Sequence, residues 1–326
     1  MPYEITVELK NWLLRKPFKI SRDVATHAET LLCHISDGTH TGSGEAAGVT
    51  YKGETVDSIK MQIEAAIPQI ADGIGREQLQ ELMPPGGARN AVDCALWDLE
   101  AKQSGRTVWQ VLDWQPHAVT TVYTIGMDTP ENMQKDASTH ADFPILKVKV
   151  GIGDPIEQIS AIRQGSPDAA IVIDANQAWT IDDLDRFAEG LKGLNVEMVE
   201  QPLALDDDEI LRGYESLIPL CADESCDSRA DLERLAGLYD IINIKLDKTG
   251  GLTEAVALAL QAESMGFDLM VGNMLGSSLA MAPAFVIAQR CKYVDIDGPL
   301  LQAEDCDHAL HYDRGSVEPF SPDLWG

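Results

Sequence analysis

The sequence predicts an α/β protein in which a barrel of parallel strands follows a smaller N-terminal α+β domain. Two observations support this prediction. Between residues 119 and 297, apolar runs of strand length alternate with segments long enough for one helix and two short loops. Residues 1–115 do not follow this repeat. A chain of 326 residues has room for a barrel of about 200 to 250 residues and a smaller domain.

The first domain is predicted to contain an antiparallel meander and two helices. The strand patterns cover residues 5–9, 29–35 and 40–45. A turn is expected at Asp37-Gly38. Apolar residues at helical spacing predict helices over 55–71 and 88–103, and Gly105 marks the end of the second one.

The domain boundaries follow from the start and end of the repeat. We expect the first domain to span residues 1–116 and the barrel to span 117–298, with residues 299–326 returning to the first domain. No long linker separates the two parts, so they should pack tightly. The loops at 17–23 and 46–53 are candidate mobile covers over a site, and plain surface loops are the alternative.

The barrel repeat begins with a strand near residues 119–125, and eight strands can be counted from there. Helices are expected near residues 130–140, 154–164, 180–191, 206–213, 228–236, 252–265 and 278–289. No comparable helix follows the eighth strand. The strands end near residues 149, 174, 200, 223, 245, 271 and 297, in steps of 25, 26, 23, 22, 26 and 26 residues. Parallel strands place their carboxyl ends on one face, the barrel mouth, where such barrels keep their active sites.

Composition and charge exclude several classes of protein. The chain is 44% hydrophobic and 24% charged, which is ordinary for a globular protein, and its net charge of −28 argues against nucleic acid and anionic membranes as partners. We find no apolar run of about 18 residues and no signal pattern, and therefore expect a cytoplasmic protein. The six cysteines lack the spacing of a zinc site, so we expect reduced, structural thiols.

Three carboxylates end consecutive strands, namely Asp174, Glu200 and Asp223. Oxygen ligands of this kind suit hard divalent ions, Mg²⁺ first and Mn²⁺ second. Zinc is disfavoured because no histidine ends a strand. The alternative is a solvated acidic rim, but converging carboxylates without a cation would repel one another and raise their pKa values.

Lysines flank these carboxylates on either side. Lys147 and Lys149 alternate on the strand before them, and Lys245 ends the strand after them. A solvated edge strand is the alternative for the first two. We expect burial and a bound cation to lower a lysine pKa toward neutrality, as a general base requires. Two bases on opposite faces of one carbon would permit racemisation or epimerisation, and the same groups could also serve elimination.

Several strings of residues resemble the muconate-lactonising subgroup of the enolase superfamily, over nearly the whole chain. They are Lys147-x-Lys149, Asp174-x-Asn176, Glu200-Gln201-Pro202, Asp223-Glu224-Ser225, Asn243-x-Lys245-x-x-Lys248-Thr249-Gly250-Gly251, Gly44-Glu45 and Ala91-x-Asp93-x-Ala95-Leu96-Trp97-Asp98. The resemblance implies an α+β capping domain over a (β/α)₇β modified TIM barrel. It also implies magnesium on the three strand-end carboxylates, Lys149 and Lys245 as the acid/base pair, and Lys147 as their electrostatic helper.

Within this subgroup, Asp295-Ile296-Asp297 resembles the dipeptide epimerases, in which paired acids hold the free α-ammonium group of a dipeptide. Arg22 is similar to the arginine that binds an acidic second side chain in the L-Ala-D/L-Glu epimerases. Asn176 and Met274 are further candidates for substrate binding. The residue after Met274 departs from the acidic residue often found there. The resemblance thus implies 1,1-proton transfer on L-Ala-D/L-Glu in murein peptide turnover.

Other functions remain as alternatives. An o-succinylbenzoate synthase, a muconate cycloisomerase or an N-acylamino acid racemase of the same subgroup would leave Asp295 and Asp297 without an ammonium partner. A metal-dependent hydrolase would want histidine ligands, and a binding protein would not need the two lysines. We expect a homo-oligomer, because closed symmetric oligomers are common among such barrels.

Overall fold

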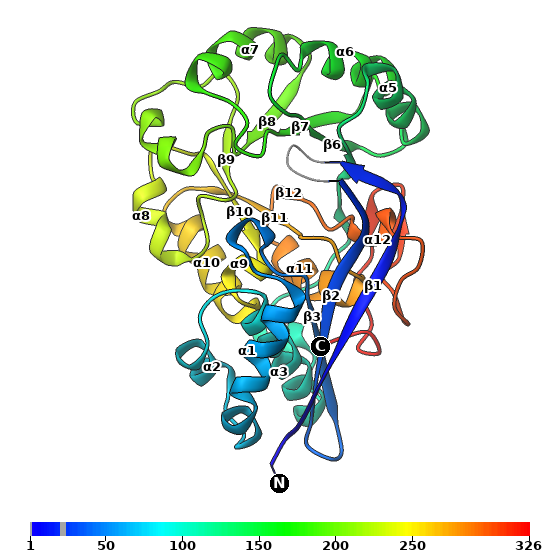
Figure 1. Ribbon diagram of the computed structural model, residues 1–326, viewed down its shortest axis with the longest axis vertical. Helices are drawn as coiled ribbons and strands as arrows, with labels where there is room; N and C mark the ends of the chain where they lie inside the picture. The colour runs from blue at the N-terminus through cyan, green and yellow to red at the C-terminus, as the bar shows by residue number, and fades with distance from the viewer. Residues whose placement is uncertain (1, 20–23) are drawn as a thin grey trace.

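The computed structural model describes residues 2–19 and 24–326. The described residues form an antiparallel three-stranded sheet, a parallel eight-stranded sheet and a second, small three-stranded sheet. In Figure 1 the N-terminal helices (light blue to cyan) lie at one end of the molecule and the first helices of the barrel (green) at the other, while the long N-terminal strands (dark blue) run up one side toward the barrel. The predicted fold class, a modified TIM barrel with an N-terminal capping sheet, is confirmed.

The capping sheet consists of β1 (Glu4–Lys19), β2 (Val24–Ser36) and β3 (Thr41–Ala46), in that order. The first two strands are longer than predicted. The β1–β2 register shifts between Leu13 and Phe18, and pairing then continues to Lys19. The prediction of a loop over 17–23 is therefore wrong for its first three residues. Pro17 lies in the irregular stretch, where a residue without an N–H group is tolerated.

The capping domain has four helices, of which the first and third pack on this sheet and the other two pack on the third. They are α1 (Val56–Ala71), α2 (Arg76–Leu82), α3 (Gly87–Ser104) and α4 (Val108–Leu112). The first and third agree with the predicted helices, and α3 ends at Gly105 in the left-handed conformation (φ 64°). β3 lies directly on α3, because a Cβ atom at Gly44 would come 2.2 Å from the carbonyl oxygen of Ala91.

Eight consecutive parallel strands make the barrel. They are β5 (Tyr123–Ile125), β6 (Ile145–Lys149), β7 (Ala170–Asp174), β8 (Val196–Glu200), β9 (Leu220–Ala222), β10 (Ile241–Lys245), β11 (Asp268–Gly272) and β12 (Tyr293–Val294). A parallel bridge between Thr121 and Val294 joins the first strand segment to the last. The strand predicted over 119–125 is split, because β4 (Val119–Thr120) pairs outside the barrel.

Five of the predicted barrel helices are present at their expected places. They are α5 (Pro130–Thr139), α6 (Ile156–Gly165), α7 (Ile181–Gly193), α10 (Leu252–Ser264) and α11 (Ser278–Ala288). The other two predicted helices are confirmed only in part, because short or 3₁₀ segments take their places. The 3₁₀ helix η2 (Leu205–Leu211) follows β8, and a 3₁₀ turn with the short helix α8 (Leu232–Leu235) follows β9. These two repeats are the shortest, with 23 and 22 residues between strand ends, and leave too little chain for a three-turn helix.

The C-terminal segment contacts both parts of the molecule. The short helix α12 (Gly298–Leu301) follows the last barrel strand, and β13 (Tyr312–Asp313) and β14 (Ser316–Val317) form a sheet with β4. At the end of the chain, the amide of Gly326 donates to Asp98 of α3 (2.9 Å). The proposed division at residues 116 and 298 stays a prediction.

None of the described helices is long and apolar enough to cross a membrane. All six cysteines are free thiols, and four of them are buried.

Candidate active site

The charged strand ends predicted from the repeat meet at the barrel mouth. Lys149 pairs in register with Asp174, which pairs in turn with Glu200. Asp223 directly follows β9, and Lys245 ends β10. Together with Lys147 these residues are called the mouth cluster below. Its members are buried except Lys149, which is partly exposed.

The lysines of the mouth cluster lie between its carboxylates. Lys147 Nζ is 2.7 Å from Glu200 Oε2 and 3.3 Å from Asp174 Oδ2. Lys149 donates to Asp174 Oδ2 at 2.5 Å. Lys245 donates to Asp223 Oδ2 at 2.6 Å. The two lysines predicted to be bases therefore contact the first and the last of the three carboxylates.

Burial and neighbouring charges shift the carboxylate pKa values in opposite directions. Burial raises the pKa of Asp174, but the ammonium groups of Lys149 and Lys147 outweigh it and bring this pKa down to about 2. Burial and the charge of Asp174 raise the pKa of Glu200 to about 7. Glu200 is thus the group in the cluster whose negative charge is least well compensated.

The carboxylates of the mouth cluster hold the pKa values of Lys245 and Lys147 above their ordinary values, and the fall expected for a base beside a bound cation stays a prediction. Burial lowers the pKa of Lys245, but Asp223 and Glu200 outweigh it and hold this pKa above its ordinary value. The pKa of Lys147 is raised for the same reason, by three surrounding carboxylates that outweigh burial. A group that carries positive charge near these carboxylates would oppose this effect.

The cluster fits a hard divalent cation in its chemistry. Glu200 Oε2 and Asp223 Oδ1 are buried, and neither receives a hydrogen bond from the described residues, although lysine Nζ atoms lie 2.7 and 2.8 Å away. Within the described chain, no three Asp, Glu, His or Cys side chains are spaced to hold a metal ion as they stand. Lysine ammonium groups lie between the carboxylates.

The two acids after β12 also lie at the mouth. Asp295 Oδ2 accepts a hydrogen bond from Lys147 Nζ at 2.7 Å, which joins β12 to β6 across the barrel. Asp297 is buried and its Oδ2 accepts from the backbone N–H of Thr124 at 2.6 Å. Burial and the charge of Asp295 raise the pKa of Asp297 to about 8. A bound cation would favour the ionised form of this carboxyl group.

Two family descriptions match almost the whole chain. Residues 3–113 match the mandelate racemase / muconate lactonizing enzyme N-terminal domain, and residues 131–323 match the enolase C-terminal domain-like family. The chain belongs to the mandelate racemase / muconate lactonizing enzyme family of the enolase superfamily.

Members of this family with a known activity are closely similar to the chain. An N-acetyl-D-glutamate racemase from Pseudoalteromonas sp. is 42% identical over 294 residues, which are 90% of this chain and 93% of that protein. An L-Ala-D/L-Glu epimerase from Escherichia coli (strain K12) is 40% identical over 309 residues, which are 94% and 96% of the two chains.

Solved structures of this family match the fold closely. An enolase family member from Agrobacterium tumefaciens, with homology to dipeptide epimerases and with bound sodium and L-Ala-L-Glu, has a TM-score of 0.97 at 44% identity and covers 100% of both chains. A dipeptide epimerase from Enterococcus faecalis, complexed with Mg and L-Leu-L-Tyr, has a TM-score of 0.91 at 27% identity and covers 98% of this chain and 97% of that one. Structural relatives in the family thus hold magnesium and dipeptides.

The structure adds supporting residues that the sequence interpretation gave no role. Asn243 Nδ2 donates to Glu200 Oε1 at 2.8 Å, and Gln201 Oε1 accepts from the backbone N–H of Asp223 at 2.9 Å. Lys248 is fully buried, with Nζ 2.8 Å from Asp223 Oδ1. All three residues stand in the strings that resemble the enolase superfamily, and polar residues at buried strand ends are the signal that could have identified them.

The remaining candidate residues have different outcomes. The backbone N–H of Asn176 donates to Asp174 Oδ1 at 2.9 Å, which places this residue beside the mouth cluster. Met274 is half-buried in the loop after β11. Arg22 lies outside the described residues. Lys19, at the end of β1, is tied to the barrel rim, because its carbonyl oxygen accepts from the N–H of Met127 at 3.0 Å.

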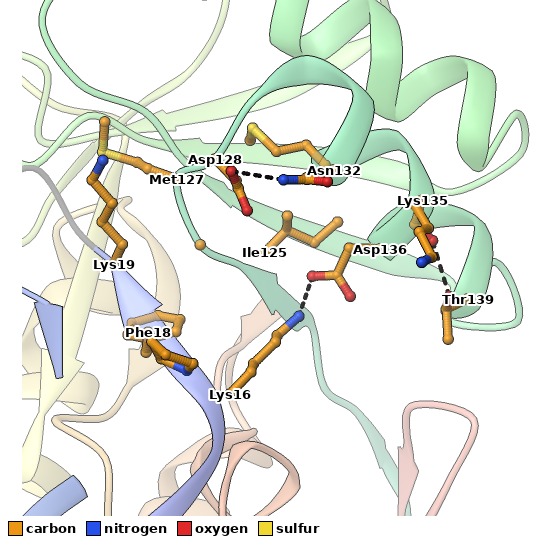
Figure 2. Close-up of a pocket in the computed structure, with 13 residues that line it drawn as sticks. Lys16, Phe18, Lys19, Ile125, Met127, Asp128, Asn132, Lys135, Asp136 and Thr139 are labelled. Carbon is orange, nitrogen blue, oxygen red and sulfur yellow. Dashed lines mark hydrogen bonds and ion pairs between the residues drawn. The ribbon is translucent and has the colours of Figure 1, made fainter. Parts of the chain in front are cut away.

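A pocket of about 250 Å³ lies beside this contact, between the end of β1 and α5. Figure 2 shows Lys16 pointing to Asp136 on α5, with which it forms an ion pair, and Lys19 beside Met127. Because Ile125 at the end of β5 also lines the pocket, it is at the barrel rim. No residue of the mouth cluster lines it. These contacts fix the end of β1 to the rim of the mouth, on the side of the first barrel strand.

Proposed function

We propose that the chain is a dipeptide epimerase that moves a proton at the α-carbon of the C-terminal residue of L-Ala-D/L-Glu, in murein peptide turnover. One observation carries the proposal. Lys149 and Lys245, on β6 and β10, stand on either side of three buried carboxylates that end or follow the strands between them. The 40% identity with an L-Ala-D/L-Glu epimerase and the similarity to a structure with bound L-Ala-L-Glu support this substrate.

The two lysines have reciprocal roles in this proposal. One removes the α-proton from its face of the substrate, and the ammonium form of the other returns a proton on the opposite face, which inverts the configuration. Each lysine then serves as base for one configuration and as acid for the other. Lys147, between Asp174, Glu200 and Asp295, keeps positive charge near the substrate carboxylate.

Asp174, Glu200 and Asp223 would hold Mg²⁺, or Mn²⁺ in its place. The convergence of these buried carboxylates at the strand ends supports this assignment, as do the relatives complexed with Mg. When bound, the ion supplies the positive charge that stabilises the enediolate form of the substrate carboxylate. Lys149 and Lys245, which contact Asp174 and Asp223, would be the groups that exchange protons with the substrate.

The remaining candidates would set substrate specificity. Asp295 and Asp297 place negative charge at the mouth, where the free ammonium group of a dipeptide could bind. Arg22 would bind the side-chain carboxylate of the glutamate residue, and Asn176 and Met274 would contact the substrate near the cluster. We further propose a cytoplasmic homo-oligomer.

A second candidate is racemisation of an N-acylamino acid such as N-acetylglutamate. The 42% identity with an N-acetyl-D-glutamate racemase favours it. Its substrate has no ammonium group, so Asp297 would face an acyl group in place of a cation. The two functions use the same lysines and carboxylates. They differ in whether Asp297 binds an ammonium group.

The test is incubation with Mg²⁺ in deuterated water, followed by proton NMR. Loss of the glutamate α-proton of L-Ala-L-Glu, with appearance of the L-Ala-D-Glu signals, is the expected result. Exchange with N-acetylglutamate and not with any dipeptide would replace the first candidate by the second. Exchange with neither substrate class would return the assignment to the lyases of the family.

A further inference from the structure

Asn273, the first residue after β11, connects two strand ends at the barrel mouth. Its Nδ2 donates to the main-chain oxygen of Asp295 at 2.8 Å and to the carboxylate Oδ1 of the same residue at 3.0 Å. Its Oδ1 accepts from the N–H of Leu275 at 2.8 Å. The side chain of Asn273 therefore stabilises the turn of its own loop, and it also binds the backbone and the side chain of Asp295.

The surrounding chain leaves this loop little freedom. A Cβ atom at Gly298 would come 3.2 Å from Asn273 Oδ1, and one at Gly272 would come 2.9 Å from Lys245 Cε. Leu275 has a left-handed conformation with φ 66°, which a non-glycine residue adopts at a cost. The amide of Asn273 thus packs against Gly298, and the residue before it lies beside Lys245, a proposed base.

The far end of the same loop is tied to the capping sheet. The backbone N–H of Ser277 donates to Glu45 Oε1 at 3.2 Å, and its hydroxyl donates to Glu45 Oε2. Glu45 also accepts hydrogen bonds from Thr30 at 2.7 Å and from Trp12 at 3.0 Å. The loop is therefore held at both ends, by β12 and by the capping domain.

The consequence concerns the two acids after β12. Both carboxylate oxygens of Asp295 have side-chain donors, Asn273 on Oδ1 and Lys147 on Oδ2. Asp297 is held through the backbone N–H of Thr124. One donor on each oxygen fixes the orientation of the Asp295 carboxylate toward Lys147 and still leaves a lone pair on each oxygen.

We propose that Asn273 is a positioning residue that keeps Asp295 turned toward Lys147. The inference rests on the proposed epimerase function. Through Asp295, Asn273 holds Lys147 in place, and with it the charge balance of the mouth cluster.

The test compares Asn273→Asp and Asn273→Ala with wild-type protein on L-Ala-L-Glu. Asn273→Asp keeps an acceptor for Leu275 but cannot donate to Asp295, whereas Asn273→Ala removes both contacts. We expect kcat to fall about 10- to 100-fold in both variants, with KM changed less than about threefold, because in this proposal Asn273 acts on Lys147 through Asp295 and does not itself bind the substrate. Asp297→Asn should show the reverse division, with the larger change in KM.

Ser278→Ala is the matched control. It removes a buried hydrogen bond to Asp305 (2.6 Å) five residues further along, with no contact to Asp295. Its kcat should stay within about twofold of wild type, while the thermal midpoint falls about as much as in Asn273→Ala. Unchanged kcat in the Asn273 variants, an equal loss in Ser278→Ala, or a kcat effect confined to Asp297→Asn would overturn the inference. A wild-type protein inactive on every dipeptide would remove the proposed function and this inference together.

Discussion

Lys147 Nζ lies 2.7 Å from Asp295 Oδ2, and this contact joins the second and the last strand of the barrel across its mouth. The same ammonium group lies 2.7 Å from Glu200 Oε2. A single buried lysine thus balances carboxylates from distant parts of the chain. Removal of either partner would leave an uncompensated buried charge, which is among the costliest changes in a protein interior.

Lys149→Ala and Lys245→Ala should each stop epimerisation but leave half of the exchange reaction. With one base gone, the other can still remove the α-proton of one configuration. We expect epimerisation to fall at least about 100-fold in both variants, since a positioned acid or base contributes that much or more. Proton NMR in deuterated water, with L-Ala-L-Glu and L-Ala-D-Glu measured separately, should show exchange of opposite isomers in the two variants. Loss of the same isomer from both would refute the two-base assignment.

Asp297→Asn should separate the two candidate functions. The substitution removes a negative charge and keeps the size of the side chain and its acceptor for Thr124. We expect kcat/KM for L-Ala-L-Glu to fall at least about tenfold, because the substrate ammonium loses its charged partner. Any activity on N-acetyl-L-glutamate should change much less. Equal losses on both substrates would show that the ammonium group does not bind at Asp297.

Glu200→Gln should weaken Mg²⁺ binding at least about tenfold, because it removes a charged oxygen ligand. Titration calorimetry with MgCl₂ measures this without reference to activity. Glu197→Gln on the same strand is the control, since Glu197 is exposed and outside the cluster. Chelation of divalent ions should abolish epimerisation in the wild-type protein, and Mn²⁺ should restore part of it. Equal affinities of the two variants would argue against Glu200 as a ligand.

Asp247 should make stability depend on pH. It accepts hydrogen bonds from the N–H groups of Ala47 and Gly48, both at 3.1 Å, and burial raises its pKa to about 6. The native state therefore holds this proton more tightly than the unfolded chain, so its stabilising effect is complete below about pH 4 and is lost as the pH rises through about 6. The loss is of the order of 3 kcal/mol.

Urea unfolding at several pH values, for wild-type protein and Asp247→Asn, measures this effect. The variant does not titrate at this position, so the difference between the two free energies of unfolding should change between pH 4 and pH 6 and then level off. A constant difference over this range would show that Asp247 does not have a raised pKa.

Gly44→Ala should destabilise the capping domain. A Cβ atom there would come 2.2 Å from the backbone oxygen of Ala91, and backbone atoms cannot move aside cheaply. We expect a loss of about 3 kcal/mol in the free energy of unfolding. Gly193→Ala is the control, because no atom lies within 4 Å of its added Cβ, and its stability should change by less than about 1 kcal/mol. Thermal or urea unfolding of both variants measures this difference, and equal free energies of unfolding would contradict the prediction.

The sequence alone determines where the barrel strands end. Strand, helix and loop lengths set a repeat of fixed size, so residues in phase with it, such as Lys149, Asp174 and Lys245, must lie on one face. It also identifies the acids after the last strand, Asp295 and Asp297. These features are local in the chain or periodic along it, which is why they can be predicted without coordinates.

Tertiary structure decides what these residues contact and in which direction their pKa values move. The contact of Lys147 with Asp295 depends on closure of the barrel, and the anchoring of Asp295 by Asn273 depends on how two strand ends meet. The pKa of Lys245 is raised, against the expectation from burial alone, because the neighbouring carboxylates outweigh the loss of solvent. The side-chain contacts and the pKa shifts both depend on distances between residues that are far apart in the chain. A sequence pattern does not contain those distances.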